Sequence, residues 1–166
     1  MTTPRAAPKP SSCGELPSST GPAADLAKLV LSAAASGHAG QQIAVTATVV
    51  VTADGQRVIS VPNGSELLIT LDGKVVGKTD QGGHGSEIPL ILKAGTTRPG
   101  QALPQSVQLS GCPTGAQAAR SPLPAGSYQL VGVLGYRADP FNSGVDGMQA
   151  GGLFQLVSEP LPIRVD

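Results

Sequence analysis

The chain has 166 residues, which is enough for about one domain with a core of its own. Its 11 basic and 11 acidic residues cancel, and no basic patch is present that would attract the phosphates of nucleic acid. No apolar run approaches the ~20 residues of a membrane span, and two Phe, two Tyr and no Trp leave little for an aromatic stacking platform. We therefore expect no nucleic-acid partner and no membrane insertion within these residues.

Residues 1–24 are rich in Pro, Ser, Thr and Ala. A segment of this composition cannot bury enough apolar area to fold alone, so we interpret it as a linker or tether that precedes one domain over residues 25–166. The polar start after Met1 is typical of a chain from which a leader or anchor has been removed, and we expect an anchor upstream.

Cys13 and Cys112 are the only cysteines. They are too few and too far apart for a zinc site made of cysteines alone. We favour a disulfide between them over two free thiols, which would close a loop of roughly 100 residues. Because such bonds persist outside the cytoplasm, the pair predicts a secreted or surface-tethered protein.

The first structured segment, residues 25–35, fits two periodicities. Its apolar residues share one face of a helix with Asp25 as N-cap, but Leu29, Leu31 and Ala33 also alternate as in a strand. We favour the strand, because residues 43–52 follow with apolar side chains at every second position.

Residues 65–78 form the clearest local unit. Asp72-Gly73 between two apolar runs is the preferred sequence of a type I′ hairpin turn, in which both positions need positive φ. The returning run 74–78 has charged ends, which suits an exposed edge strand.

Further short strands are predicted over residues 56–61, 87–93, 104–110, 152–158 and 161–165. Pro89 removes a ladder donor, which places its strand at an edge or a bulge. Residues 123–137 form the longest strand, around which we expect the others to be organised. Seven to nine strands with frequent turns and no strong helix predict an antiparallel β-sandwich.

Tyr128 begins that longest strand, two residues after Gly126, in the sequence Pro-Ala-Gly-Ser-Tyr. This pattern resembles the tyrosine corner of immunoglobulin-like sandwiches, whose hydroxyl ties the start of the strand to upstream backbone. Leu130 stands where an antibody domain has its second core cysteine, residues 65–71 contain no Trp and residues 43–52 contain no cysteine. The chain therefore resembles bacterial immunoglobulin-like domains, among them the BsuPI-type (intracellular proteinase inhibitor-like) module and secreted actinobacterial surface domains.

The resemblance implies an all-β, immunoglobulin-like antiparallel β-sandwich. It carries over no inhibitor residue, because no position matches a reactive-loop motif.

No pattern of catalytic residues is present, and we expect neither an enzyme nor a cofactor. His38 and His84 lie in Gly-rich loops without partners at ligand spacing. There is no Gly-x-Ser-x-Gly elbow, and residues 82–85 lack the spacing and the following helix of a phosphate loop.

The loop of residues 139–151 carries Asp139, Asn142 and Asp146, whose oxygens could hold Ca²⁺. Their spacing does not match an EF-hand, and Asp and Asn are ordinary turn formers, so we favour the turn interpretation. Tyr128 and Tyr136 are eight residues apart on one face of the long strand, and we expect both to be core residues rather than a binding surface.

These observations predict a non-catalytic extracytoplasmic domain that binds another protein in scaffolding, adhesion or sensing. Loops 79–86 and 139–151 are the expected recognition elements, because loops vary freely on a rigid frame. A proteinase inhibitor-like module is the first alternative, and a calcium-dependent adhesion domain the second.

Overall fold

The structure is a computed structural model that describes residues 13–21, 23–54, 58–61, 66–78, 88–91, 93–95, 105–112, 121–138 and 153–166. Within these ranges every regular element is a β-strand, which confirms the predicted all-β fold. In chain order the strands are β1 (Ala27–Ala33), β2 (Ser36–Gly37), β3 (Gln42–Val51), β4 (Val58–Val61), β5 (Glu66–Leu71), β6 (Lys74–Lys78), β7 (Ile88–Ile91), β8 (Gln105–Gln108), β9 (Gly126–Ala138), β10 (Leu153–Val157) and β11 (Leu161–Val165).

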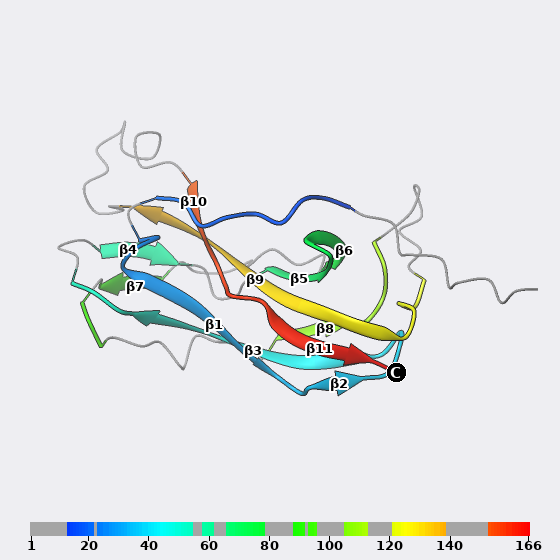
Figure 1. Cartoon of the computed structure of the whole chain (residues 1–166). Helices are drawn as coiled ribbons and strands as arrows, with labels where there is room; N and C mark the ends of the chain where they lie inside the picture. The colour runs from blue at the N-terminus through cyan, green and yellow to red at the C-terminus, as the bar shows by residue number, and fades with distance from the viewer. Residues whose placement is uncertain are drawn as a thin grey trace, which may run out of the picture.

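The strands form two sheets with the core between them (Figure 1). The small sheet has the order β1-β3-β8, and the large sheet contains the other eight strands. All described pairs run antiparallel except β2 with β11, so the predicted sandwich is confirmed. If β10 and β11 are counted as one interrupted strand and the two-residue β2 is left out, the described strands number nine.

The small sheet shows why residues 27–33 form a strand and not a helix. Ala27, Leu29 and Leu31 are buried, whereas Lys28 and Val30 between them are exposed. Strand β3 has the same alternation over ten residues, and β1 pairs with it along its whole length. The apolar side chains of a helix recur with a period of 3.6 residues, whereas the neighbouring strand β3 presents side chains with a period of two. A strand matches this neighbour and a helix does not.

The long strand β9 is the centre of the large sheet. One flank pairs with β11 near its start and with β10 near its end, and the other flank pairs with β5 and β4. Tyr128, Leu130, Leu134 and Tyr136 point into the core, and Leu130 has no exposed surface. The organising role predicted for residues 123–137 is thereby confirmed.

A bulge separates β10 from β11. Val157 pairs with Val133 and Leu161 with Leu130, so three residues on one strand lie opposite two on the other. Because of the extra residue, even-numbered residues such as Leu156 face the core in β10, whereas odd-numbered residues such as Ile163 face it in β11. Pro160 lies in this bulge, where a missing N–H interrupts no ladder bond.

The β5–β6 hairpin turns at Asp72 and Gly73. Their φ angles are 53° and 78°, and two consecutive positive values define a type I′ turn. Leu67 and Ile69 face the core, while Leu68 faces the opposite side of the sheet.

Strand β2 carries the chain from one sheet to the other. It follows β1 of the small sheet and pairs in parallel with β11 of the large sheet. The edge of the final strand is thus partly covered: Arg164 N donates to Ala35 O at 2.9 Å, and Asp166 N donates to Gly37 O at 2.9 Å.

Strand β7, which carries Pro89, pairs only with β4 among the described strands and ends the order of the large sheet. This is the position expected for a strand that contains proline.

Candidate functional site

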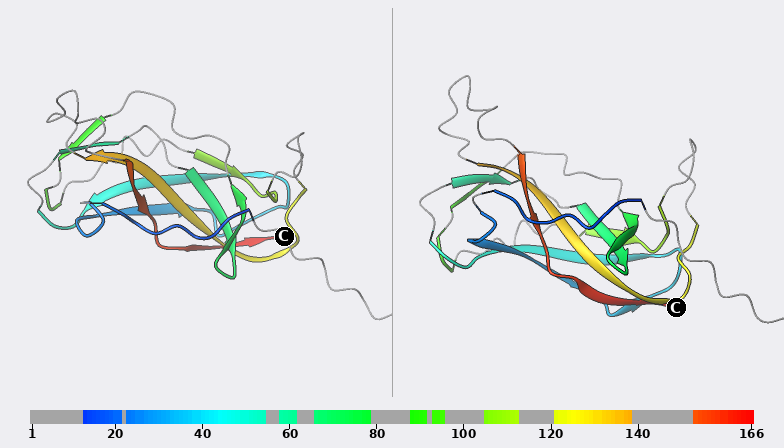
Figure 2. Two further views of the ribbon diagram at one scale, coloured as in Figure 1. Left: turned by 90° about the horizontal axis from the view of Figure 1, so that it is seen from above. Right: turned by 45° about the horizontal axis from the view of Figure 1, so that its top comes forward.

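Residues 13–21, which we call the strap, cross the outer face of the large sheet. The strap starts at β6, passes β5 and β9, and ends at β10, as both views of Figure 2 show for the dark-blue segment. The sequence predicts a linker over residues 1–24. Within that range the structure describes 13–21 and 23–24, and these residues are bonded to the sandwich at both ends of the strap.

At its first end the strap adds a short strand to β6. Cys13 N donates to Val75 O at 2.8 Å, Val75 N donates to Gly14 O at 2.9 Å, and Glu15 forms an antiparallel bridge with Lys74. The charged ends of residues 74–78 predict an exposed edge, but this edge is paired at the first two residues of β6, Lys74 and Val75. This pairing protects an edge that could otherwise accept a foreign strand.

At its second end the strap is held mainly by polar side chains. Val157 N donates to Ser19 Oγ at 2.8 Å and Gln155 N donates to Thr20 Oγ1 at 3.1 Å. The strap's backbone takes part as well, because Thr20 N donates to Gln155 O at 2.8 Å and the Gln155 side chain donates to Ser18 O at 3.0 Å. Sequence reasoning missed this anchor, since its partners lie about 135 residues apart.

Beneath the strap lies a second apolar cluster, separate from the core between the sheets. Its buried members are Leu68, Val75 and Val131, which come from β5, β6 and β9. Cys13 of the strap packs against them together with Val133 and Val157. Val131 has no exposed surface although it is on the outer face, so the sheet is covered at this point.

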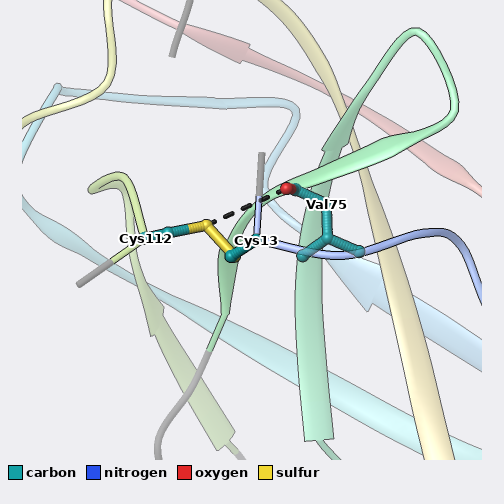
Figure 3. Close-up of a disulfide and its surroundings, with 3 residues drawn as sticks. All are labelled: Cys13, Val75 and Cys112. Atoms are coloured by element: carbon teal, nitrogen blue, oxygen red, sulfur yellow. Dashed lines mark hydrogen bonds between the residues drawn. A yellow bond between two sulfur atoms is a disulfide. The ribbon is translucent and has the colours of Figure 1, made fainter. Parts of the chain in front are cut away.

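The Cys13–Cys112 disulfide locks the first end of the strap, and the predicted bond is present (Figure 3). The two Cα atoms are 5.9 Å apart, within the usual range for a bridge. Cys112 follows β8 of the small sheet, so the bond joins the strap on the outer face to the other layer. Cys112 Sγ lies 3.8 Å from Val75 O, and because a disulfide sulfur has no hydrogen we treat this approach as a contact, not as a donated bond.

The strap leaves the outer face at Tyr136. The Tyr136 hydroxyl donates to Thr20 O at 2.6 Å and accepts from Ala23 N at 3.0 Å, so it joins the strap to the turn before β1. Gly21 has a φ of 83°, and a Cβ there would collide with the Tyr136 hydroxyl and the Phe154 ring. Burial raises the pKa of Tyr136, and the hydrogen bond from Ala23 N opposes part of that rise.

Tyr128 makes a local tie at the start of β9. Its hydroxyl donates to Pro124 O at 2.7 Å, four residues earlier in the chain. Gly126 opens the strand between them, and burial of the ring raises the pKa of Tyr128. Both tyrosines are at most 5% exposed and offer almost no ring surface to a ligand.

The outer face of the small sheet is mostly exposed, with Thr48 and Val50 half-buried. Ten side chains of β1, β3 and β8 point away from the core: Lys28, Val30, Ser32, Gln42, Ala44, Thr46, Thr48, Val50, Ser106 and Gln108. Lys28 is the only charged one among them. Val30 at the centre of β1 is 48% exposed, the most of any large hydrophobic residue in the described ranges.

Polar groups that could perform chemistry do not gather in the part of the chain that the structure describes. No three His, Cys, Asp or Glu residues in it lie close enough to hold a metal ion. His38 is exposed between β2 and β3. The calcium candidates Asp139, Asn142 and Asp146, the residue His84 and the predicted recognition loops 79–86 and 139–151 lie outside the described residues.

No helix in the described ranges has the length and apolar character needed to cross a membrane. Comparisons with known protein families, with curated proteins and with solved structures found no match to this chain.

Proposed function

We propose that this chain is a non-catalytic extracytoplasmic β-sandwich domain that binds another protein through the outer face of its small sheet. The observation that carries the proposal is the near absence of charge on that face, one lysine among ten outward side chains. Protein surfaces designed to stay in water carry roughly 25–35% charged residues, and the centres of protein interfaces are depleted of charge. A surface with one charged and four β-branched side chains among ten is suited to another folded protein rather than to an ionic ligand.

The compartment in this proposal is supported by the disulfide. A cross-link between the strap and the small sheet persists where thiols are not kept reduced, in secreted or surface proteins. The domain then acts at the cell surface, in adhesion, scaffolding or sensing.

We further propose that the domain is immunoglobulin-like. The support is the division of strands, with β1-β3-β8 in one sheet and β11-β9-β5-β6 neighbours in the other, together with the hydroxyl of Tyr128 bonded to Pro124 O. Fold likeness of this kind supports an architecture and leaves the partner to be found by experiment. No described residue favours the inhibitor-like or calcium-dependent alternatives over protein binding.

The test places a charge at the centre of the proposed face. In Thr46→Arg the new guanidinium stands on β3 beside Ser32, where an apposed protein would have to desolvate it. Gln129→Arg is the matched control, because Gln129 is exposed on the outer face of the large sheet. Each variant, immobilised after its thermal unfolding has been checked, is used to capture proteins from a cell-envelope extract of the source organism.

We expect the wild type and Gln129→Arg to retain the same partner and Thr46→Arg to lose at least tenfold in its recovery. Equal recovery by all three proteins would move the binding site off the small sheet, and recovery of no partner by the wild type would remove the proposed function.

A further inference from the structure

The two ends of the strap are held in different ways, and this asymmetry is the starting observation. The β10 end has six hydrogen bonds to Gln155, Val157 and Tyr136. The β6 end has two backbone hydrogen bonds to Val75, the bridge between Glu15 and Lys74, and the disulfide. Leu16, which follows the β6 contacts, is 39% exposed, so this half of the strap buries little apolar surface beyond Cys13.

We propose that the Cys13–Cys112 bond is a latch, whose reduction releases residues 13–16 from β6 while residues 18–20 stay bound to β10. The backbone pairing with Lys74 and Val75 and a half-exposed leucine do not offset the conformational freedom that four residues regain. The disulfide holds this half in place by keeping it close to β6 at all times. The proposal does not depend on which protein the small sheet binds.

The chemistry of release starts at Cys13. Cys13 is half-buried and Cys112 is 7% exposed, so an incoming thiolate reaches the Cys13 sulfur more easily. It forms a mixed disulfide with Cys13, and Cys112 leaves as a thiolate that takes up a proton. The second thiol of a dithiol reductant then closes on the first, which frees Cys13 as a thiol. The reductant loses two electrons and two protons, and the protein gains them.

Release changes the surface of the large sheet. The edge of β6 at Val75 loses its paired segment, and the cluster of Leu68, Val75 and Val131 loses Cys13 as part of its cover. An unpaired strand edge next to exposed apolar side chains is a site for strand addition. In the oxidised state the strap occupies that site, so the latch keeps the protein from pairing there.

Hydrogen exchange of the full-length chain, followed by mass spectrometry with and without dithiothreitol, tests the latch. The Val75 amide donates to Gly14 O in the latched state, so a peptide covering β6 should exchange at least tenfold faster after reduction. A peptide covering residues 155–157 should change by less than twofold. Cys13→Ser/Cys112→Ser should exchange like the reduced protein without any reductant.

A second variant separates the two ends of the strap. Ser19→Ala removes the acceptor for Val157 N and should speed exchange at β10 in the oxidised protein while β6 stays slow. Glutamyl endopeptidase gives an independent readout, since cleavage after Glu15 should require reduction. Two results would overturn the latch: unchanged exchange at β6 after reduction, or equal acceleration in every peptide, which would mean that the bond holds the whole fold.

Discussion

Replacing Tyr136 by Phe isolates the hydrogen bonds that join the strap to the first strand. The ring stays, with its packing against Phe154 at a centroid distance of 5.7 Å, and only the hydroxyl is lost. Ala23 is fully buried, so its N–H is left without a partner, whereas Thr20 is exposed and its carbonyl can turn to water. An orphaned buried donor costs about 1–3 kcal/mol and a lost bond to a wetted carbonyl about 1 kcal/mol, so we expect a loss of about 2–4 kcal/mol.

The matched control is Tyr128→Phe. The Tyr128 hydroxyl makes a single bond, to Pro124 O, and its removal leaves no donor unsatisfied. We therefore expect a loss of about 1 kcal/mol for this variant. Urea denaturation of the oxidised proteins, extrapolated linearly to water, measures both values, and an unchanged m-value shows that the unfolded states are comparable. Equal losses in the two variants would refute the reasoning, because they would show that Ala23 N finds another partner.

Three further predictions concern crowding, turn geometry and pH. A Cβ on Gly77 would stand 2.5 Å from Ser110 O, a backbone atom that cannot rotate away, so Gly77→Ala should cost about 3 kcal/mol in urea denaturation, and a loss below 1 kcal/mol would contradict this packing. Gly73→Ala meets no atom within 4 Å, and only its φ of 78° opposes the substitution, so its cost should be about 1 kcal/mol. Burial raises the pKa of Tyr128 and Tyr136 in the folded state, whereas both tyrosines of the unfolded chain ionise near pH 10. Unfolding above about pH 10 therefore releases protons, and the free energy of unfolding should fall as the pH rises further. The fall should be less steep in Tyr136→Phe, which has lost one of the two hydroxyls.

Much of the sandwich could be predicted because its strands show their burial locally. The alternation over residues 43–52 predicts which side of β3 is buried, and Asp72-Gly73 predicts the hairpin. The choice between helix and strand for residues 25–35 needed the neighbouring strand as well as the local pattern. Two cysteines in the whole chain made the disulfide predictable without any knowledge of the fold.

The strap and the outer face of the small sheet, with its single charge, could not be predicted, for two physical reasons. Ser19 and Thr20 bond to β10 at sequence separations near 135, and a run of small polar residues looks the same whether it is bonded or solvated. The outer face of the small sheet is assembled from three strands, so it depends on the register of β1 and β8 against β3. Each strand alone contributes only a few unremarkable polar or small side chains.

The bulge between β10 and β11 determines how the closing strand responds to a change in chain length. Val157 pairs with Val133 and Leu161 with Leu130, so deleting one of the three residues between Val157 and Leu161 would restore one-to-one pairing with β9. Ile163 would still lie opposite Tyr128 and stay in the core, because the register of neither strand would change. Deleting Pro162 inside β11 would instead turn the residues after it to the opposite face, and Arg164 would point into the core. Natural variants of this sequence should therefore differ in length between Val157 and Leu161 rather than within β11, which their sequences alone would show.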